Sequence, residues 1–146
     1  MGLFADLALV RRERGLQTTF RGATPTAAES AAPDDQRLRL HVLLDRERLG
    51  LARCALFAGR AIAQFMFEHE RNEQLRFWAN RHKTIVMLAA HAADMQELAA
   101  YLAKQQKVSH LITDEALDDL PVAAVYEPLP AMEGKVLFGR FAPLAL

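Results

Sequence analysis

A run of cationic side chains surrounds two aromatic ones between residues 71 and 83. The basic residues are Arg71, Arg76, Arg81, His82 and Lys83, and the aromatic ones are Phe77 and Trp78. Cations bind phosphates and aromatic rings stack on bases, so this combination is typical of nucleic-acid binding. We therefore predict that Arg71, Arg76, Arg81 and Lys83 bind nucleic acid. The alternative is that Trp78, at helical spacing from Leu75, belongs to the core and the charges solvate a helix surface.

The other residue types that carry chemistry are few and scattered. Cys54 is the only cysteine, which excludes an internal disulfide and a multi-thiolate zinc site, and we expect a buried thiol. Ser30 and Ser109 lack a nucleophile-elbow context, and no glycine-rich phosphate loop or dinucleotide fingerprint is present. No two of the five histidines have the i, i+4 spacing of a helical metal site. They stand at positions 41, 69, 82, 91 and 110. The sequence therefore predicts no metal and no cofactor.

Length and composition favour one globular domain. The chain has 146 residues, of which 51% are hydrophobic and 25% charged, and its formal net charge is zero. The charge is uneven: 14 Lys and Arg face 10 Asp and Glu up to Lys83, and 4 face 8 from Thr84 onward. No apolar run approaches a membrane span, and no secretory signal is seen, because the apolar residues 3–10 precede the arginines. We expect a cytoplasmic protein without a membrane span.

The first 36 residues differ from the rest of the chain. Leu3, Phe4, Leu7 and Val10 have helical spacing, and arginines follow at positions 11, 12 and 14, where cations suit a helix C-terminus. Residues 22–36 are small, polar and interrupted by proline, which is typical of a linker. We predict an amphipathic helix and linker over residues 1–36 and a domain over residues 37–146.

Within that domain, hydrophobic periodicity predicts alternating strands and helices. Residues 84–89 resemble a strand buried on both faces, and Asp94 and Glu97 predict a capping box. The expected strands are 37–45, 84–89, 108–113, 122–126 and a last one at 135–141; the expected helices are 51–69, 73–81 and 95–106. Helical crossovers require parallel strands with helices on the sheet, so the predicted class is a two-layer or three-layer α/β domain with a mixed, mostly four-stranded sheet.

This order, together with particular residues, resembles peptidyl-tRNA hydrolase of the second type. The matching segments span about residues 37–144, and their order and spacing carry the likeness: LHVLLD at 40–45, Trp78 followed by KTIVML at 83–88, ADMQELAAYLAKQ at 93–105, LITDEA at 111–116, VAAVYEP at 122–128 and PAMEGKVLFGRF at 130–141. The resemblance implies a peptidyl-tRNA hydrolase type 2-like fold and a homodimer.

The same resemblance implies where the site residues lie. The family signature Gly-Lys-x-x-Ala-Gln-x-x-His-Ala is similar to residues 59–67, where Arg60 replaces the lysine, Gln64 is kept and Phe67 replaces the histidine. A second register, without an insertion, aligns Arg53, Cys54 and Ala55 with the signature and keeps no functional side chain. Asp114 corresponds to the family's aspartate. The segment ALDDLP at 116–121 lacks the hydroxyl that the family has there.

These residues leave three functions open. We expect first a binding or interaction module with a degraded catalytic motif, acting on tRNA. The alternative is an active esterase in which Arg60 holds phosphate, Gln64 donates to the oxyanion and Asp114 orients water. A third is an assembly protein that binds a protein partner through residues 1–36. Whether the chain is an enzyme is left open by the sequence.

Overall fold

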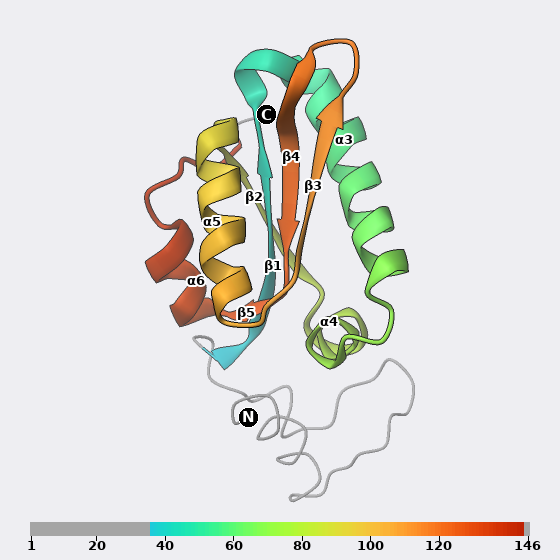
Figure 1. Cartoon of the computed structure of the whole chain (residues 1–146). Helices are drawn as coiled ribbons and strands as arrows, with labels where there is room; N and C mark the ends of the chain where they lie inside the picture. The colour runs from blue at the N-terminus through green and yellow to red at the C-terminus, as the bar shows by residue number, and fades with distance from the viewer. Residues whose placement is uncertain (1–35, 145–146) are drawn as a thin grey trace, which may run out of the picture.

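A computed structural model describes residues 36–144, which form an α/β domain with helices on both faces of a mixed sheet (Figure 1). The predicted helix and linker over residues 1–36 lie almost wholly outside the described residues. The elements are β1 (Leu38–Leu44), α3 (Arg46–Glu68), α4 (Glu73–Phe77), a π-helical turn η2 (Trp78–His82), β2 (Thr84–Ala89), α5 (Ala92–Lys104), β3 (Ser109–Asp114), β4 (Asp118–Tyr126), β5 (Leu129–Pro130) and α6 (Ala131–Phe138). Of the two predicted arrangements, the three-layer one is correct (Figure 1).

The sheet has five strands, four of them in the order β2-β1-β4-β3, with the two-residue β5 beside β1. β1 pairs in parallel with β2, from Arg39 opposite Thr84 to Leu44 opposite Ala89. The other pairs, β1 with β4 and β4 with β3, are antiparallel. Because a parallel pair needs a crossover, the chain must leave the sheet between β1 and β2. Helices α3 and α4 and the turn η2 form this predicted crossover.

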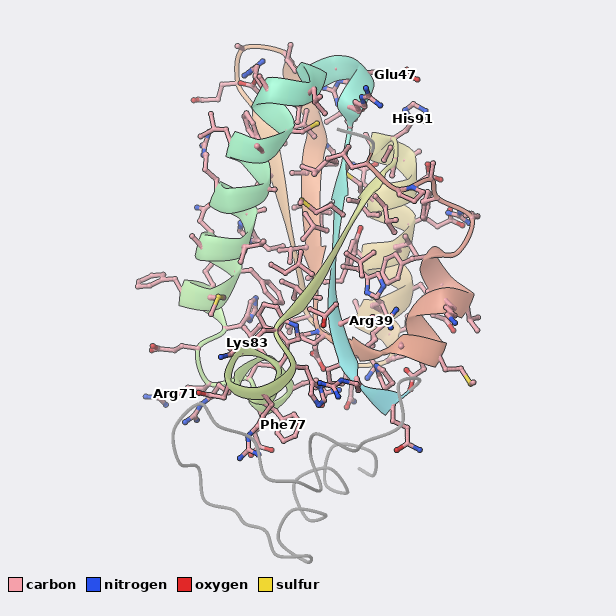
Figure 2. All side chains as sticks on the ribbon, turned by 180° about the vertical axis from the view of Figure 1, so that it is seen from behind. Arg39, Glu47, Arg71, Phe77, Lys83 and His91 are labelled. Carbon is pink, nitrogen blue, oxygen red and sulfur yellow. The ribbon has the colours of Figure 1, made fainter. Side chains whose placement is uncertain are left out.

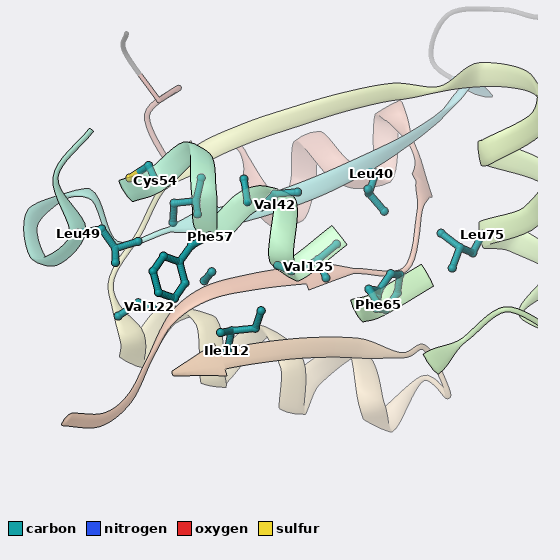
Figure 3. Packing of buried hydrophobic residues seen from close by; sticks show 14 of the residues in the cluster. Leu40, Val42, Leu49, Cys54, Phe57, Phe65, Leu75, Ile112, Val122 and Val125 are labelled. Atoms are coloured by element: carbon teal, nitrogen blue, oxygen red, sulfur yellow. The ribbon is translucent and has the colours of Figure 1, made fainter. Parts of the chain in front are cut away.

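The core has one cluster on each face of the sheet. The first lies between the sheet and α3 and includes Phe57 and Phe65 (Figure 3). Trp78 belongs to the same cluster. The second lies under α5 and α6 and includes Leu102, Tyr126 and Phe138. Cys54 is fully buried in the first cluster, as expected, and burial raises the pKa of its thiol. A buried thiol with a raised pKa is a poor nucleophile.

β2 is not buried on both faces, which corrects the prediction for residues 84–89. It is the edge strand, and Thr84, Ile85 and Met87 are exposed. α3 packs mainly on β1, β3 and β4, and within the described part of the chain the outer edge of β2 is paired only near its end, where Leu88 forms a bridge with Pro143. The apolar run alone could not distinguish an edge strand from a central one.

Residues 135–141 do not form the predicted strand. Most of them belong to α6, whose N-cap is Pro130, and α6 packs on β1. The ring of His41 stacks on Phe138 with centroids 4.3 Å apart. A Cβ on Gly134 would lie 2.5 Å from Cε1 of that ring. Close packing against β1, rather than a periodic pattern, therefore explains this helix.

Two helices begin earlier than predicted. α3 starts at Arg46, after an N-cap at Asp45, and Gly50 interrupts it with φ 77° and ψ 161°. α5 starts at Ala92, with His91 as its N-cap and Asp94 as the reciprocal residue of the capping box, so the predicted pair of Asp94 and Glu97 is wrong. By length and composition α3 also qualifies as a candidate membrane span, which the sequence prediction did not anticipate. Core helices share these properties, and α3 packs on the sheet.

Candidate functional site

Asp114, at the end of β3, faces α3. Its Oδ2 accepts from the guanidinium of Arg53, and its Oδ1 accepts from the backbone N–H of Ala116 at 3.1 Å. The pKa of Asp114 lies below its ordinary value. The largest cause is the hydrogen bond from the Ala116 N–H, followed by the hydrogen bond from Arg53 and the positive charges of Arg53 and Arg60. A carboxylate with these donors is a weak proton acceptor.

Arg53, not Arg60, is therefore the direct partner of Asp114. The two arginines flank one ring, with their Cζ atoms 5.3 Å (Arg53) and 4.8 Å (Arg60) from the centroid of Phe57. Arg60 acts on Asp114 through its charge. Gln64 is exposed one turn further along α3, and its side chain makes no hydrogen bond within residues 36–144. The structure thus brings Arg60 near Asp114 but does not bring Gln64 into contact with either.

The signal for Arg53 was present in the sequence. Positions 53 and 60 are two turns apart on the same side of a helix, and the second register had already placed Arg53 beside the motif. Spacing alone could not say which arginine would reach the end of β3, because that depends on how α3 sits along the strand.

A second candidate site lies at the other end of the domain, at α4 and η2. Arg71, Arg76 and Lys83 are exposed there, and we call these three residues the basic end. Figure 2 shows Arg71 and Lys83 close to this end, beside Phe77. Within the described part of the chain, none of the three forms an ion pair or a side-chain hydrogen bond. Arg81, the fourth predicted residue, instead packs over the Phe77 ring at 5.4 Å.

Local backbone geometry presents Lys83. It caps η2 in the left-handed region with φ 59°, and its N–H donates to the Trp78 carbonyl at 3.0 Å. Trp78 is 5% exposed and donates from Nε1 to the Thr84 carbonyl at 2.8 Å. Trp78 is thus a core residue that fixes the turn from which Lys83 projects, as the alternative prediction held.

His82 adds no positive charge to this end at neutral pH. It is buried, and its Nδ1 accepts from the N–H of Leu38 at 2.8 Å. Burial, helped by the charges of Arg37 and Arg81, lowers the pKa of His82 to about 4. The imidazole is therefore a neutral structural acceptor.

Carboxylates gather at the opposite end, where β3 turns into β4. We call Asp114, Glu115, Asp118 and Asp119 the acidic turn. Arg48, near the start of α3, pairs with Asp118 and donates to the Pro121 carbonyl at 3.1 Å. Two of the four carboxylates thus have an arginine partner on α3, and the turn as a whole disfavours the approach of phosphates.

A hollow of about 170 Å³ lies at the carboxyl ends of β1 and β2. Such a place is where open α/β sheets often bind ligands, since adjacent strands lead to helices on opposite faces. Its walls include Asp45, Glu47 and His91, together with Asp94 and Arg140, which pair with each other at 3.2 Å. The charges are mixed and partly neutralised, so the hollow indicates no ligand class.

Within residues 36–144, no group of three His, Cys, Asp or Glu side chains is placed to hold a metal ion. Comparison with known proteins gave no matching family model and no matching curated protein. The function has to be inferred from the side chains and their placement.

Proposed function

We propose that this domain is an RNA-binding module that contacts RNA through the basic end. The observation that carries the proposal is the exposure at one end of Arg71, Arg76 and Lys83, none of which forms an ion pair within the described residues. Exposed Glu70 and Glu73 lie beside Arg71 in the chain, and the larger excess of carboxylates, the acidic turn, lies at the other end. Such a polar distribution orients a polyanion toward one end of a protein whose net charge is zero.

The basic end is suited to the phosphate backbone rather than to base edges. Each guanidinium of Arg71 and Arg76 can bind a phosphate with two hydrogen bonds, and Lys83 contributes a point charge. Trp78 is buried, and Arg81 packs over the half-buried ring of Phe77, so neither ring is a fully exposed stacking platform. Binding should therefore depend on RNA shape and charge more than on sequence.

tRNA is the RNA class that the family resemblance suggests. The crossover between β1 and β2 and the mixed sheet are compatible with that resemblance. Catalysis is not part of the proposal, because Asp114 already accepts two hydrogen bonds and Phe67 stands where the family has histidine. The domain would bind tRNA and leave the ester intact.

The proposal is tested by measuring tRNA affinity of the full chain by fluorescence anisotropy between roughly 50 and 200 mM KCl. The double variant Arg76→Ala/Lys83→Ala is expected to bind about tenfold more weakly. The slope of log K against log [KCl] should fall by about 1.5 to 2 units, since two phosphate contacts are removed.

The matched control is Arg46→Ala/Lys135→Ala, which removes the same charge from exposed positions outside the basic end. It should change the affinity less than about twofold. Equal losses in both double variants would mean nonspecific attraction, and no binding of wild-type protein at the lowest salt would refute the proposal. Release of free tRNA from peptidyl-tRNA, abolished by Asp114→Asn, would instead support the esterase.

A further inference from the structure

The side of α3 that faces away from the sheet is apolar along most of its length. We call this side the outer face of α3. Leu56 is 57% exposed and Phe67 is 81% exposed, and most of the exposed residues between them are small or apolar. The exposed polar residues Arg60 and Gln64 border this side of the helix. The outer face consists of Ala52, Ala55, Leu56, Gly59, Ala63, Met66 and Phe67.

A helix that is apolar on both sides is normally covered on both sides. The inner side of α3 carries Cys54, Phe57, Ala61 and Phe65 and packs on the sheet. Its polar residues lie toward β3, where Arg53 meets Asp114 and Glu68 contacts His110 Nδ1 at 3.1 Å. The outer face therefore lacks the charged surface expected of a helix that faces water.

We propose that residues 3–14 of this chain cover the outer face of α3. This segment lies outside the described residues, and its sequence has the complementary pattern. Leu3, Phe4, Leu7 and Val10 form an apolar stripe, and arginines 11, 12 and 14 follow it. The inference does not rest on the RNA-binding proposal.

Charge complementarity fixes the direction of the docked segment. The start of α3 lies beside the acidic turn, to which Arg48 and Arg53 connect it. The far end of α3 leads to Arg71 and the basic end. The excess of carboxylates at the first end attracts the arginines at 11–14 more strongly than the mixed charges of the second end, where exposed Glu68 and Glu70 adjoin Arg71. We therefore place these arginines at the acidic turn. The docked helix would thus run antiparallel to α3. Since a helix rises about 10 Å over seven residues, Leu7 lies beside Leu56 if Arg14 lies beside Leu49.

The connecting residues are long enough for this arrangement. The described chain begins at residue 36, beside β1 at the end of the domain where α3 finishes (Figure 1). α3 from Leu51 to Glu68 spans about 27 Å. A chain of the length of residues 15–35 has a random-coil root-mean-square end-to-end distance of about 25 Å, so the covalent connection keeps residues 3–14 at high effective concentration near the face.

Two other occupants fit the surface less well. A second copy packed through α3 around Gly59 would bring two Arg60 side chains together. A bilayer with anionic lipids would be repelled by the acidic turn at the start of the helix. Only the chain's own segment supplies an apolar stripe together with positive charge at the required end.

The full chain can be tested by disulfide trapping, with Cys54 left in place because it is buried. Leu7→Cys/Leu56→Cys is expected to form an intramolecular disulfide about tenfold faster than Leu7→Cys/Val136→Cys. Val136 is 80% exposed on α6, on the opposite face of the sheet, and is the matched control. Replacing arginines 11, 12 and 14 by Glu in the first pair should slow the reaction about tenfold, because the attraction becomes repulsion.

Trypsin cleavage of the unmodified protein provides a measurement that needs no variant. Cleavage after arginines 11, 12 and 14 should be about tenfold slower than after Arg21, which lies in the linker. Equal trapping rates in the two cysteine pairs, or equal cleavage at all four arginines, would overturn the inference. Disulfides that form mainly between chains, at a rate that rises with protein concentration, would assign the face to a second copy.

Discussion

Two buried histidines have the same titration behaviour for the same reason but different structural roles. Burial is the largest cause that lowers the pKa of both His41 and His82 from 6.5 to about 4. His82 accepts the N–H of Leu38, whereas His41 Nδ1 has no hydrogen-bond partner within the described residues. His82 is therefore needed as an acceptor, and His41 is held mainly by stacking on Phe138.

This behaviour predicts a loss of stability in mild acid. The unfolded chain takes up protons at pH near 6.5 and the folded chain only near 4, so the unfolded state binds more protons between these values. The contribution of the two neutral histidines to the free energy of unfolding is fully present above pH 6.5. It falls as the pH decreases to about 4 and is constant below that. Each histidine should contribute about 3 kcal/mol to the loss, measured by urea unfolding at a series of pH values.

Variants at the two positions should separate the two roles. His41→Leu is expected to remove about half of the pH dependence and to cost less than about 1.5 kcal/mol at pH 7, because it also removes a buried Nδ1 that has no partner within the described residues. His82→Leu should cost about 1 to 3 kcal/mol more at pH 7, since the buried N–H of Leu38 loses its acceptor. An equal cost at pH 7 for both substitutions would contradict these assignments.

At the scale of elements, α3 contains two glycines with opposite requirements. Gly50 has φ 77° and ψ 161°, a conformation that only glycine adopts readily, and it allows the first turn at Asp45 to join the rest of the helix. Gly59 lies within the helix, and a Cβ there would meet no atom within 4 Å. The same substitution should therefore have opposite effects at the two positions.

Gly50→Ala is expected to lower the free energy of unfolding by about 1 to 3 kcal/mol. Gly59→Ala should raise it by about 0.5 to 1 kcal/mol, because alanine loses less entropy in a helix. Urea unfolding of both variants checks this prediction. A loss of stability in Gly59→Ala, with no change in Gly50→Ala, would mean that the kink is not required.

Local patterns predicted most of these elements, and tertiary contacts explain the errors. The alternation of Leu38, Leu40, Val42 and Leu44 predicted β1, because these residues share the face that packs in the first core cluster. The spacing of the buried residues predicted the main part of α3. The burial of the other face of β1, which carries His41 and Leu43, did not appear in that alternation. The edge position of β2 and the helix at 131–138 depend on what packs beside them. The close approach of Gly134 to His41, for example, joins residues far apart in the chain and has no local signature.

The candidate site follows the same rule. Exposure of Arg71, Arg76 and Lys83 agreed with a sequence pattern of charges, whereas the burial of His82 did not appear in that pattern. The pairing of Asp114 with Arg53 rather than with Arg60 depends on the register of α3 along β3. No spacing rule supplies that register, since it is set by packing of the first core cluster.

At the scale of the whole molecule, the sheet joins two separate cores into one structure. Phe57, Phe65 and Trp78 lie on the face covered by α3, and Leu102 and Tyr126 lie on the face covered by α5 and α6. β1 and β4 contribute to both clusters: Val42 and Leu43, adjacent in β1, belong to different ones. If the core cluster on one face of the sheet loses its packing, β1 and β4 lose contacts that also hold the cluster on the other face. We therefore expect one cooperative unfolding transition.

A cavity on one face should therefore be detected by a probe on the other. Leu102→Ala, at a fully buried position of α5, is expected to lower the free energy of unfolding by about 2 to 4 kcal/mol. Trp78, the only tryptophan, reports on the opposite face. Its fluorescence should show the same shift of the urea midpoint as far-UV circular dichroism. Tyr101→Ala, at the neighbouring and 47% exposed position, should change the free energy of unfolding by less than about 0.5 kcal/mol with either probe. A fluorescence transition that stays in place while the dichroism midpoint falls would mean that the α3 face unfolds independently.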